Sequence, residues 1–184
     1  VKIVLDSKTD IFEKVTNDID FAFLALHGKF GEDGCVQSIL EAMDIPYSGC
    51  GPLTSALCMD KNMTKKILRD SNLPTAPWTV VKSVDDINYD EIDEIGYPVF
   101  IKPNSGGSSV ATFLINSKDE VLNAVQKGLE VDDCVMIEKY IPGGEYTSFI
   151  LNGEVFPTIS IKANSEFFDF ESKYSANGAV EEVV

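Results

Sequence analysis

Glycine, serine and lysine residues are concentrated in one segment near the middle of this 184-residue chain. Residues 99–115 have the sequence VFIKPNSGGSSVATFLI, two apolar stretches joined by a polar loop. The loop donors are two glycine amides and two serine hydroxyls, from Gly106, Gly107, Ser108 and Ser109. Because glycine lacks a Cβ, the backbone at Gly106 and Gly107 can take positive φ angles and turn successive N–H groups toward one anion. Lys102 adds a positive charge just before the loop. The segment therefore predicts a hairpin whose loop binds phosphate; an ordinary glycine-containing hairpin with a surface lysine is the alternative.

Two familiar phosphate-binding motifs do not occur in the sequence. There is no G-x-x-x-x-G-K-[ST] segment, and Gly49-Cys50-Gly51 is not followed by the third glycine of a dinucleotide-binding fingerprint. The predicted phosphate loop is therefore neither a P-loop nor a Rossmann turn.

Two residues in the first third of the chain are further candidates. His27 follows the apolar stretch Phe21–Leu26 and opens a glycine-rich loop before a predicted helix. Open α/β sheets bind ligands in loops of this kind, although a histidine that bonds its own loop backbone is the alternative. Lys61 lies off the apolar face of its predicted helix, where it can reach a ligand or remain solvated.

A candidate nucleotide contact follows the apolar stretch Cys134–Ile137. The next residues, 138–147, have the sequence EKYIPGGEYT. Free amides and carbonyls of an extended segment can pair with the edge of an adenine, and a carboxylate a few residues later can bind ribose hydroxyls.

The first unit has the alternation of an α/β domain. Val1–Leu5 and Phe21–Leu26 predict buried strands, and Ile11–Val15 predicts a short helix between them. Strands joined in this way favour a parallel β-α-β unit. The next helix has an apolar stripe at i, i+3, i+4 and i+7, formed by Val36, Ile39, Leu40 and Met43.

One more helix is predicted before the middle of the chain, with Thr54 or Ser55 as its N-cap. Its buried face is formed by Ala56, Met59, Met63 and Ile67. Leu73–Pro77 contains two prolines and predicts a stiff connector before a new unit.

The second half alternates short strands with helices. Trp78–Val81 and Cys134–Ile137 predict strands, and six acidic residues between Asp85 and Glu94 predict a solvated helix face. The capping box at 117–120 opens a helix. Its inward side chains are Val121, Leu122, Val125 and Leu129.

The last forty residues begin with a hairpin. Asn152-Gly153 between apolar stretches is a strong hairpin signal, and Pro157 indicates a sheet edge or a bulge. The aromatic, aperiodic segment 164–175 predicts a loop packed by its own side chains that can act as a lid.

Composition excludes several classes of partner. Thirty acidic and fifteen basic residues give a net charge of −15, so we expect neither nucleic acid nor anionic lipid to bind. The four cysteines show no C-x-x-C spacing and the single histidine cannot complete a zinc site, so we predict no metal site in this sequence. Free cysteines fit a reducing cytosol, and no apolar run is long enough for membrane insertion. The first residue, Val1, indicates that the sequence begins partway through a gene product.

Five segments occur in a specific order: HGKFGEDGCVQSILE at 27–41, SALCMDK at 55–61, FIKPNSGGSSV at 100–110, IEKYIPGGEYT at 137–147 and FFDFESKYS at 167–175. In this order they resemble the D-alanine:D-alanine ligase family of the ATP-grasp superfamily, over essentially the whole chain. The resemblance implies an α/β protein with an ATP-grasp fold, preceded by part of an open parallel α/β domain. Residues 1–57 would be part of the N-terminal substrate-binding domain, 58–140 the central ATP-grasp lobe, and 141–184 the start of the C-terminal lobe with its ω-loop.

The resemblance also implies which residues bind ATP. The matching positions are Lys61 and Lys102 for the phosphates, Gly106, Gly107, Ser108 and Ser109 for the covering loop, Glu138, Lys139 and Ile141 for adenine, Glu145 for ribose, and Lys173 on the ω-loop. His27 resembles the histidine of the first D-alanine site. Tyr174 resembles the ω-loop tyrosine that meets Ser108 in a hydrogen-bonded network.

The implied reaction joins two D-alanines for peptidoglycan precursor synthesis. ATP phosphorylates the carboxylate of one D-alanine, and the amine of the second attacks the acylphosphate to give D-alanyl-D-alanine, ADP and phosphate. Lysines, loop amides and Mg²⁺ suit the charge that develops. Tyr174 matches the family pattern for the dipeptide, not the D-lactate ester. The resemblance further implies a cytoplasmic enzyme that is a homodimer at full length.

The sequence also departs from the family pattern. No Gly-x-Ser-x-Glu motif precedes His27, and the 184 residues lack the C-terminal part that supplies an oxyanion arginine and the Mg²⁺ ligands. Ala111 replaces a glycine that is usual after the phosphate loop. Two alternatives stay open: another ATP-grasp carboxylate–amine ligase with a different acceptor, and a nucleotide-binding fragment without turnover, which we expect of residues 1–184 in isolation.

Overall fold

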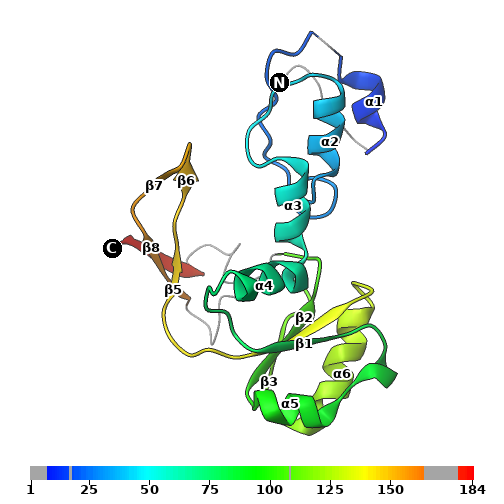
Figure 1. The fold of residues 1–184 in the computed structure, drawn as a ribbon, viewed down its shortest axis with the longest axis vertical. Coiled ribbons are helices and arrows are strands. Elements are labelled where there is room, and N and C mark those ends of the chain that lie inside the picture. Colours follow the sequence, from blue (N-terminus) through cyan, green and yellow to red (C-terminus); the bar gives the residue numbers. More distant parts are fainter. Residues whose placement is uncertain (1–7, 17, 108, 164–177) are drawn as a thin grey trace. The chain divides into compact units, whose positions relative to one another are not determined.

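The computed structural model describes residues 8–16, 18–107, 109–163 and 178–184 (Figure 1). The chain divides into two compact units, Val1–Leu73 and Pro74–Val184. This division falls within the proline-containing connector that the sequence indicates at 73–77. Within the described ranges, the helices lack the length and apolar composition that a membrane crossing requires.

The first unit contains four helices among its described residues. They are α1 (Asp10–Lys14), α2 (Cys35–Ala42), α3 (Pro52–Met59) and α4 (Lys61–Asp70). The predicted short helix and the predicted helix with the 36–43 stripe are confirmed as α1 and α2. Their apolar faces meet in a small core of Ile11, Val36, Leu40 and Ile45.

The predicted buried strand at 21–26 is wrong. Only one isolated parallel bridge forms there, between Ala22 and Tyr47, and Phe23 is 80% exposed. Ala22 and Leu24 pack against the core, whereas Phe21 and Phe23 are exposed. Both faces of the stretch are apolar, but only the face with Ala22 and Leu24 contacts the core. The partner strand expected at 1–5 lies outside the described residues.

The single helix predicted after Ser55 is also wrong, because Asp60 divides it. Asp60 has extended backbone angles (φ −83°, ψ 100°), and its carboxylate accepts a 2.9 Å hydrogen bond from the Met63 N–H, which caps α4. The break changes which residues face inward. Met63 and Ile67 are 41% and 45% exposed, and Lys65 is buried.

A four-stranded antiparallel sheet forms the body of the second unit. Its strands are β1 (Trp78–Val81), β2 (Val99–Pro103), β3 (Phe113–Ile115) and β4 (Val135–Lys139), in the order β1-β4-β2-β3. The predicted strands at 78–81 and 134–137 and the hairpin of β2 with β3 are confirmed.

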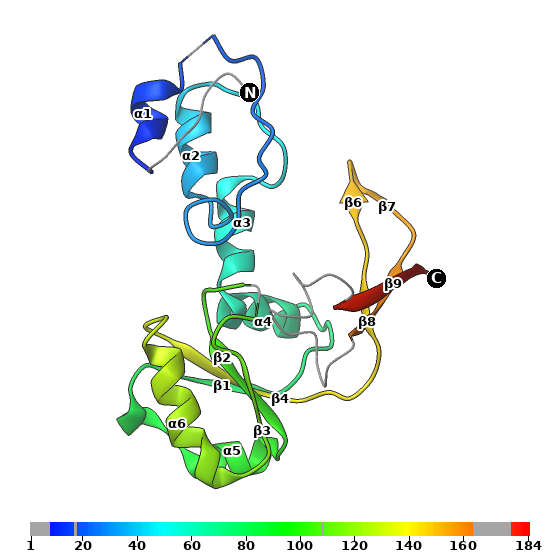
Figure 2. The same cartoon turned by 180° about the vertical axis from the view of Figure 1, so that it is seen from behind.

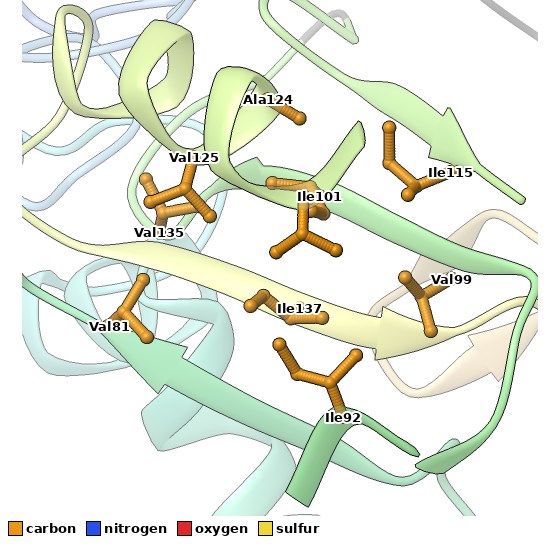
Figure 3. Close-up of a cluster of buried hydrophobic side chains, with 10 residues drawn as sticks. Val81, Ile92, Val99, Ile101, Ile115, Ala124, Val125, Val135 and Ile137 are labelled. Carbon is orange, nitrogen blue, oxygen red and sulfur yellow. The ribbon is translucent and has the colours of Figure 1, made fainter. Parts of the chain in front are cut away.

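Two helices, α5 (Tyr89–Ile95) and α6 (Lys118–Leu129), cover one face of this sheet, and a short 3-10 turn, η1 (Val84–Asp86), precedes α5. Figure 3 shows the side chains that fill the space between these helices and the sheet. This core consists of Val81, Ile92, Val99, Ile101, Ile115, Val121, Ala124, Val125, Val135 and Ile137. Every second residue of β2 and β4 contributes, so the other face of the sheet remains for different side chains.

The helix caps follow the sequence closely. The capping box of α6 is present: the Glu120 carboxylate accepts bonds from the Ser117 N–H at 3.1 Å and hydroxyl at 2.8 Å. The inward prediction was wrong for Leu122, which is 43% exposed, because Ala124 and Gly128 complete the buried face instead.

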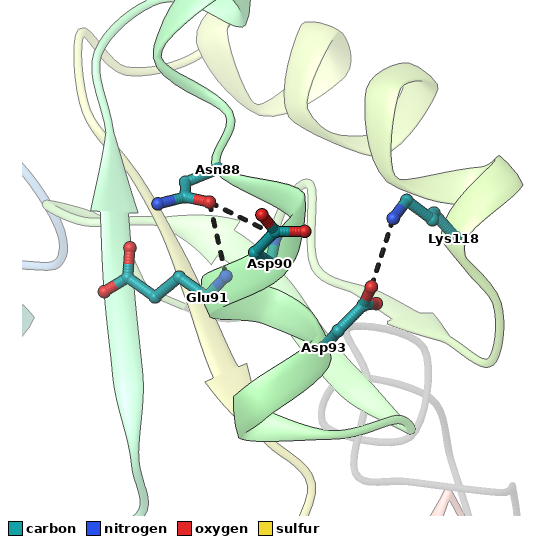
Figure 4. Close-up of polar contacts among 5 residues, drawn as sticks. All are labelled: Asn88, Asp90, Glu91, Asp93 and Lys118. Carbon is teal, nitrogen blue, oxygen red and sulfur yellow. Dashed lines mark hydrogen bonds and ion pairs between the residues drawn. The ribbon is translucent and has the colours of Figure 1, made fainter.

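The acidic segment 85–94 is solvated as predicted, since all six of its carboxylates are exposed. Figure 4 shows Asn88 capping α5 by accepting bonds from the N–H groups of Asp90 and Glu91, and the Asp93 carboxylate 3.1 Å from the Lys118 ammonium. The burial of Ile92 therefore fixes α5 by one face while its charges stay in water.

The remaining strands form small antiparallel pairings, visible from both sides in Figures 1 and 2. The strands are β5 (Glu145–Thr147), β6 (Ile150–Leu151), β7 (Glu154–Val155), β8 (Ile159–Ala163) and β9 (Ala179–Val183). β8 lies between β5 and β9, and β6 pairs with β7. The Asn-Gly hairpin is confirmed, with φ angles of 51° and 83° at its two turn residues. Pro157 has no N–H and separates β7 from β8, as expected for a break at an edge.

Candidate functional site

An ion pair lies on the face of the four-stranded sheet opposite the helices. Lys102 of β2 is in register with Met136 of β4, and Phe100 with Glu138, so Lys102 and Glu138 are diagonal neighbours on one face. Their side chains form a salt bridge and are 23% and 15% exposed. The charge of Lys102 is thus already balanced, and a phosphate that binds here must compete with the Glu138 carboxylate.

Apolar and aromatic side chains surround this pair. Phe100 and Tyr140 stack edge to face with ring centroids 5.5 Å apart. Met136 is fully buried, and Trp78 lies opposite Glu138 in the register of β1 with β4. Aromatic side chains beside one cation and one carboxylate suit a ligand that combines a flat ring with phosphates.

The phosphate loop takes its positive φ angles at residues other than its two glycines. The left-handed φ angles occur at Ser109 (57°) and Ala111 (50°), and neither Gly106 nor Gly107 is among the positive-φ residues. A 3.3 Å hydrogen bond joins the Val110 N–H to the Gly107 carbonyl. The two glycines therefore do not use the positive φ angles that their lack of a Cβ allows.

The predicted adenine segment has fewer available amides than expected. The Lys139 N–H donates to the Pro77 carbonyl at 2.9 Å, and the Tyr140 N–H donates to the Pro98 carbonyl at 3.1 Å. Both amides thus continue the pairing of β4 with its neighbours. Ile141 is 63% exposed, and among the described residues no acceptor is found for its N–H. Of the three amides at residues 139–141, that of Ile141 is therefore the one left for a ligand.

The Lys139 side chain is directed to the chain before β2. Its ammonium donates to the carbonyls of Gly96 at 2.8 Å and Tyr97 at 3.1 Å. Gly96 has a φ angle of 79° and ends α5. This contact fastens the turn between α5 and β2 to the end of β4, which the sequence does not indicate.

The loop around His27 is held by its own acidic residues. The Glu32 carboxylate accepts a bond from the Gly28 N–H at 2.5 Å, and the Asp33 carboxylate accepts from the Phe30 N–H at 2.7 Å. His27 itself is exposed. Burial raises the pKa of Asp33, but its hydrogen bonds outweigh that effect and leave the pKa below its ordinary value.

Two residues of this loop region had no assigned role from the sequence. The buried Gln37 side chain donates to the Gly31 carbonyl at 3.0 Å and fixes the loop to α2. Cys35 bonds to Asp33, which raises the pKa of its thiol. The signal for Asp33 is its place just before a helix, where a carboxylate satisfies backbone N–H groups.

The structure places the remaining candidates in separate parts of the chain. His27 and Lys61, the first residue of α4, belong to the first unit. Glu145 is the exposed first residue of β5. Ser108, Lys173 and Tyr174 lie outside the described residues. Of the predicted residues, the structure thus brings Lys102 and Glu138 into direct contact.

Metal ligands were not expected in this sequence. Among the described residues, no three histidine, cysteine or acidic side chains are grouped so that they could hold a metal ion.

Comparison with known proteins identifies two family models. Residues 4–50 match the model "D-ala D-ala ligase N-terminus" and residues 67–184 match "D-ala D-ala ligase C-terminus". D-alanine--D-alanine ligase B of Clostridium perfringens is 57% identical over 97% of this chain and 59% of its own length. The chain thus spans about three fifths of the length of the curated relatives it matches.

Solved structures give the same result for the fold. The D-alanine--D-alanine ligase of Bacillus anthracis is 49% identical, with a TM-score of 0.87 over 100% of this chain and 60% of that one. The same enzyme complexed with ATP has a TM-score of 0.85 at 46% identity, and covers 100% and 58% of the two chains. VanG D-Ala:D-Ser ligase of Enterococcus faecalis is 33% identical, with a TM-score of 0.72 over 89% of this chain and 49% of that one.

Proposed function

Because the chain belongs to the D-alanine–D-alanine ligase family, we propose that the protein containing it joins two D-alanines to D-alanyl-D-alanine with ATP. The observation that supports this most strongly is that the N- and C-terminal models of one ligase match consecutive parts of the chain. The substrate, the product and the finer division of the lobes at residues 57 and 140 are part of this proposal.

The proposed reaction has two steps. A carboxylate oxygen of the first D-alanine attacks the terminal phosphorus of ATP, and ADP leaves. The amine of the second D-alanine then attacks the acylphosphate carbon, loses a proton, and phosphate leaves. Negative charge gathers first on the transferred phosphoryl group and then on a tetrahedral oxyanion, so cations and fixed N–H donors lower both barriers.

Site roles follow from residue chemistry and position. We assign ATP to the face that carries Lys102 and Glu138, since a relative of this fold is complexed with ATP and the face has an aromatic pair beside a cation. The residues proposed for ATP are Lys61, Lys102, Gly106, Gly107, Ser108, Ser109, Glu138, Lys139, Ile141, Glu145 and Lys173. Those proposed for the reacting D-alanines are His27, Ser108 and Tyr174.

The wider context is proposed on the same basis. The reaction would supply the dipeptide for peptidoglycan precursors in the cytoplasm, where ATP is available. A second copy of the chain would be the partner in a homodimer, and neither nucleic acid nor a membrane would be required. Mg²⁺ would accompany ATP with ligands from elsewhere in the protein.

The decisive experiment is Mg-ATP-dependent phosphate release by the full-length protein with D-alanine or L-alanine, with mass spectrometry of the product. We expect release and a D-alanyl-D-alanine product with D-alanine only. No release from a demonstrably full-length, folded sample would contradict the proposal.

A second candidate acceptor is D-serine, because a D-Ala:D-Ser ligase is among the structural neighbours. The experiment mixes D-alanine with D-serine or D-lactate at equal concentrations and compares the products. An excess of D-alanyl-D-serine or of the D-lactate ester would replace the D-alanine assignment while keeping the ligase class.

Two substitutions in the full-length enzyme test the division of roles. Lys102→Ala should weaken both ATP affinity and turnover, because it removes a charge-assisted phosphate contact. Tyr174→Phe should slow turnover and leave ATP affinity nearly unchanged. Equal loss of ATP affinity in both variants would refute this division.

A further inference from the structure

A buried carboxylate lies at the base of the phosphate loop. Asp132 is 6% exposed and belongs to the connection between α6 and β4. One carboxylate oxygen, Oδ2, accepts a 2.5 Å bond from the Ser105 N–H, and Oδ1 accepts a 3.0 Å bond from the Asp133 N–H. A charged acceptor buried in this way holds its amide donors firmly, because their bonds are charge-assisted and little water competes for them.

Ser105 is the first residue that the sheet itself does not hold. The pairing of β2 with β4 ends at Pro103 and Val135, and one further bond joins the Asn104 N–H to the Cys134 carbonyl at 2.9 Å. The bond from Ser105 to Asp132 extends this anchoring by one residue into the loop. It therefore sets the direction in which the chain leaves the sheet.

Asp132 is itself positioned by rigid elements. Its N–H donates to the Gly128 carbonyl at 3.1 Å, at the end of α6. Gly128 lies close against the fully buried Val135 of β4. The end of α6, the start of β4 and the first loop residue are thus joined through one side chain, an arrangement that precise loop placement requires.

We propose that Asp132 is a positioning residue for nucleotide binding, which fixes the start of the phosphate loop through the Ser105 amide. The expected effect of Asp132 on ATP binding rests on the proposed function, whereas the anchoring of Ser105 by Asp132 does not. No contact between Asp132 and a substrate is required. Loss of the carboxylate should loosen residues 105–107 and so weaken ATP binding without changing the D-alanine site.

The experiment compares Asp132→Asn and Asp132→Ala with the matched control Asp133→Asn, all in the full-length protein. Asp133 is the exposed neighbour, so its substitution changes the same charge without touching the Ser105 bond. The first measurement is hydrogen exchange of the Ser105 amide in the nucleotide-free protein. We expect exchange about tenfold faster or more in both Asp132 variants and unchanged in the control, as loss of a charge-assisted bond implies.

The second measurement is the equilibrium dissociation constant for ATP, together with KM for D-alanine. We expect the ATP constant to rise by about tenfold in Asp132→Ala, since one charge-assisted bond is lost. The rise should be smaller in Asp132→Asn, which keeps one acceptor, and KM for D-alanine should stay within about twofold of wild type. Thermal unfolding tests whether each variant is folded. If Asp132→Ala does not fold, the measurements on Asp132→Asn test the proposal.

Unchanged Ser105 exchange in Asp132→Asn would overturn the proposal. So would a parallel rise in the ATP constant and in KM for D-alanine, which indicates general damage. A wild-type protein that binds no ATP would instead refute the proposed function, and the exchange measurement would still decide whether Asp132 anchors Ser105.

Discussion

Opposite charges on the face of the sheet opposite the helices neutralise each other, because Lys102 and Glu138 form a salt bridge there. Lys102 and Glu138 are each less than one quarter exposed, so water screens their pairing only in part. A nucleotide that binds Lys102 must exchange one carboxylate for its phosphates. The pair therefore keeps the lysine in place in the nucleotide-free state.

A double-mutant cycle measures this pairing. Lys102→Met and Glu138→Gln should each lower the free energy of unfolding by about 1–3 kcal/mol, because each leaves one charge half-buried without its partner. The double variant should lose less than the sum, with a coupling of about 1–2 kcal/mol. Urea denaturation of the four proteins gives these values, and strictly additive losses would show that the pair contributes nothing.

A second residue-scale prediction concerns Cys35 and its neighbour. The bond to Asp33 raises the pKa of the exposed Cys35 thiol above its ordinary value of 9.0, so less thiolate is present at any pH below that value. Asp33→Asn should lower this pKa and accelerate alkylation of Cys35 at pH 8.

Peptide mass spectrometry after timed iodoacetamide treatment follows the reaction. Cys50, which is exposed in the same protein, is the internal control and should react at an unchanged rate. Slower or unaltered alkylation of Cys35 in Asp33→Asn would contradict the assigned cause.

At the scale of elements, the contact of α6 with β4 fixes the position of the chain that anchors the start of the phosphate loop. Gly128 allows this contact, because an added Cβ would lie 2.8 Å from a methyl carbon of Val135. Val135 is fully buried and cannot move aside into solvent. The helix and the strand that position the loop are therefore close-packed at one point.

Gly128→Ala should accordingly destabilise the protein. Overpacking lowers the free energy of unfolding by about 1–3 kcal/mol. The better helix propensity of alanine near a helix end offsets less than about 1 kcal/mol of this loss. The matched control is Gly107→Ala, where an added Cβ would meet nothing within 4 Å. Its effect should stay within about 0.5 kcal/mol. Denaturant unfolding of both variants tests this, and a Gly128→Ala variant as stable as wild type would refute it.

The segment just after the phosphate loop has backbone strain at a residue that is not glycine. Ala111 has a φ angle of 50°, which costs a residue with a Cβ roughly 1–2 kcal/mol. Ala111→Gly should therefore raise the free energy of unfolding by up to about 1 kcal/mol, after the entropy of glycine in the unfolded chain is subtracted.

Ala124→Gly is the matched control for this substitution. Ala124 is buried on α6, where glycine should destabilise by about 1 kcal/mol or more. Thermal unfolding compares the two variants. Equal destabilisation by both would show that position 111 gains nothing from glycine.

At the scale of the whole molecule, the described residues hold part of the proposed site. They contain the Lys102 and Glu138 face and the phosphate loop, but no group of side chains arranged for a metal ion. The chain spans about three fifths of its curated relatives.

Residues 1–184 in isolation should release no phosphate from ATP in the presence of Mg²⁺ and D-alanine, and should bind nucleotide weakly. Phosphate release and calorimetry on a sample of confirmed intact mass test this, with the full-length protein as the positive control. Phosphate release by the isolated segment would overturn the prediction and show that these residues suffice for the first step.

Local patterns in the sequence determined much of the second unit. The apolar stretches that begin at Val99 and Cys134 and the capping box at Ser117 specify strands and a helix through nearest-neighbour chemistry, and the structure contains them. The ordered motifs also implied the α/β ATP-grasp fold, which the solved ligase structures support. The strands and the helix could be predicted because each depends on residues that are adjacent in the chain, whereas the fold was implied by the resemblance to a known family.

Tertiary structure alone decided which of these residues meet. Lys102 and Glu138 are 36 positions apart, and Ser105 and Asp132 are 27 apart; their contacts follow from the strand order β1-β4-β2-β3. The same applies to Asp60, whose carboxylate starts a new helix where the apolar spacing predicted a continuous one. The spacing of apolar residues indicates which side of a helix or strand is buried. Strand register and loop direction depend on packing between distant segments, which no local pattern encodes.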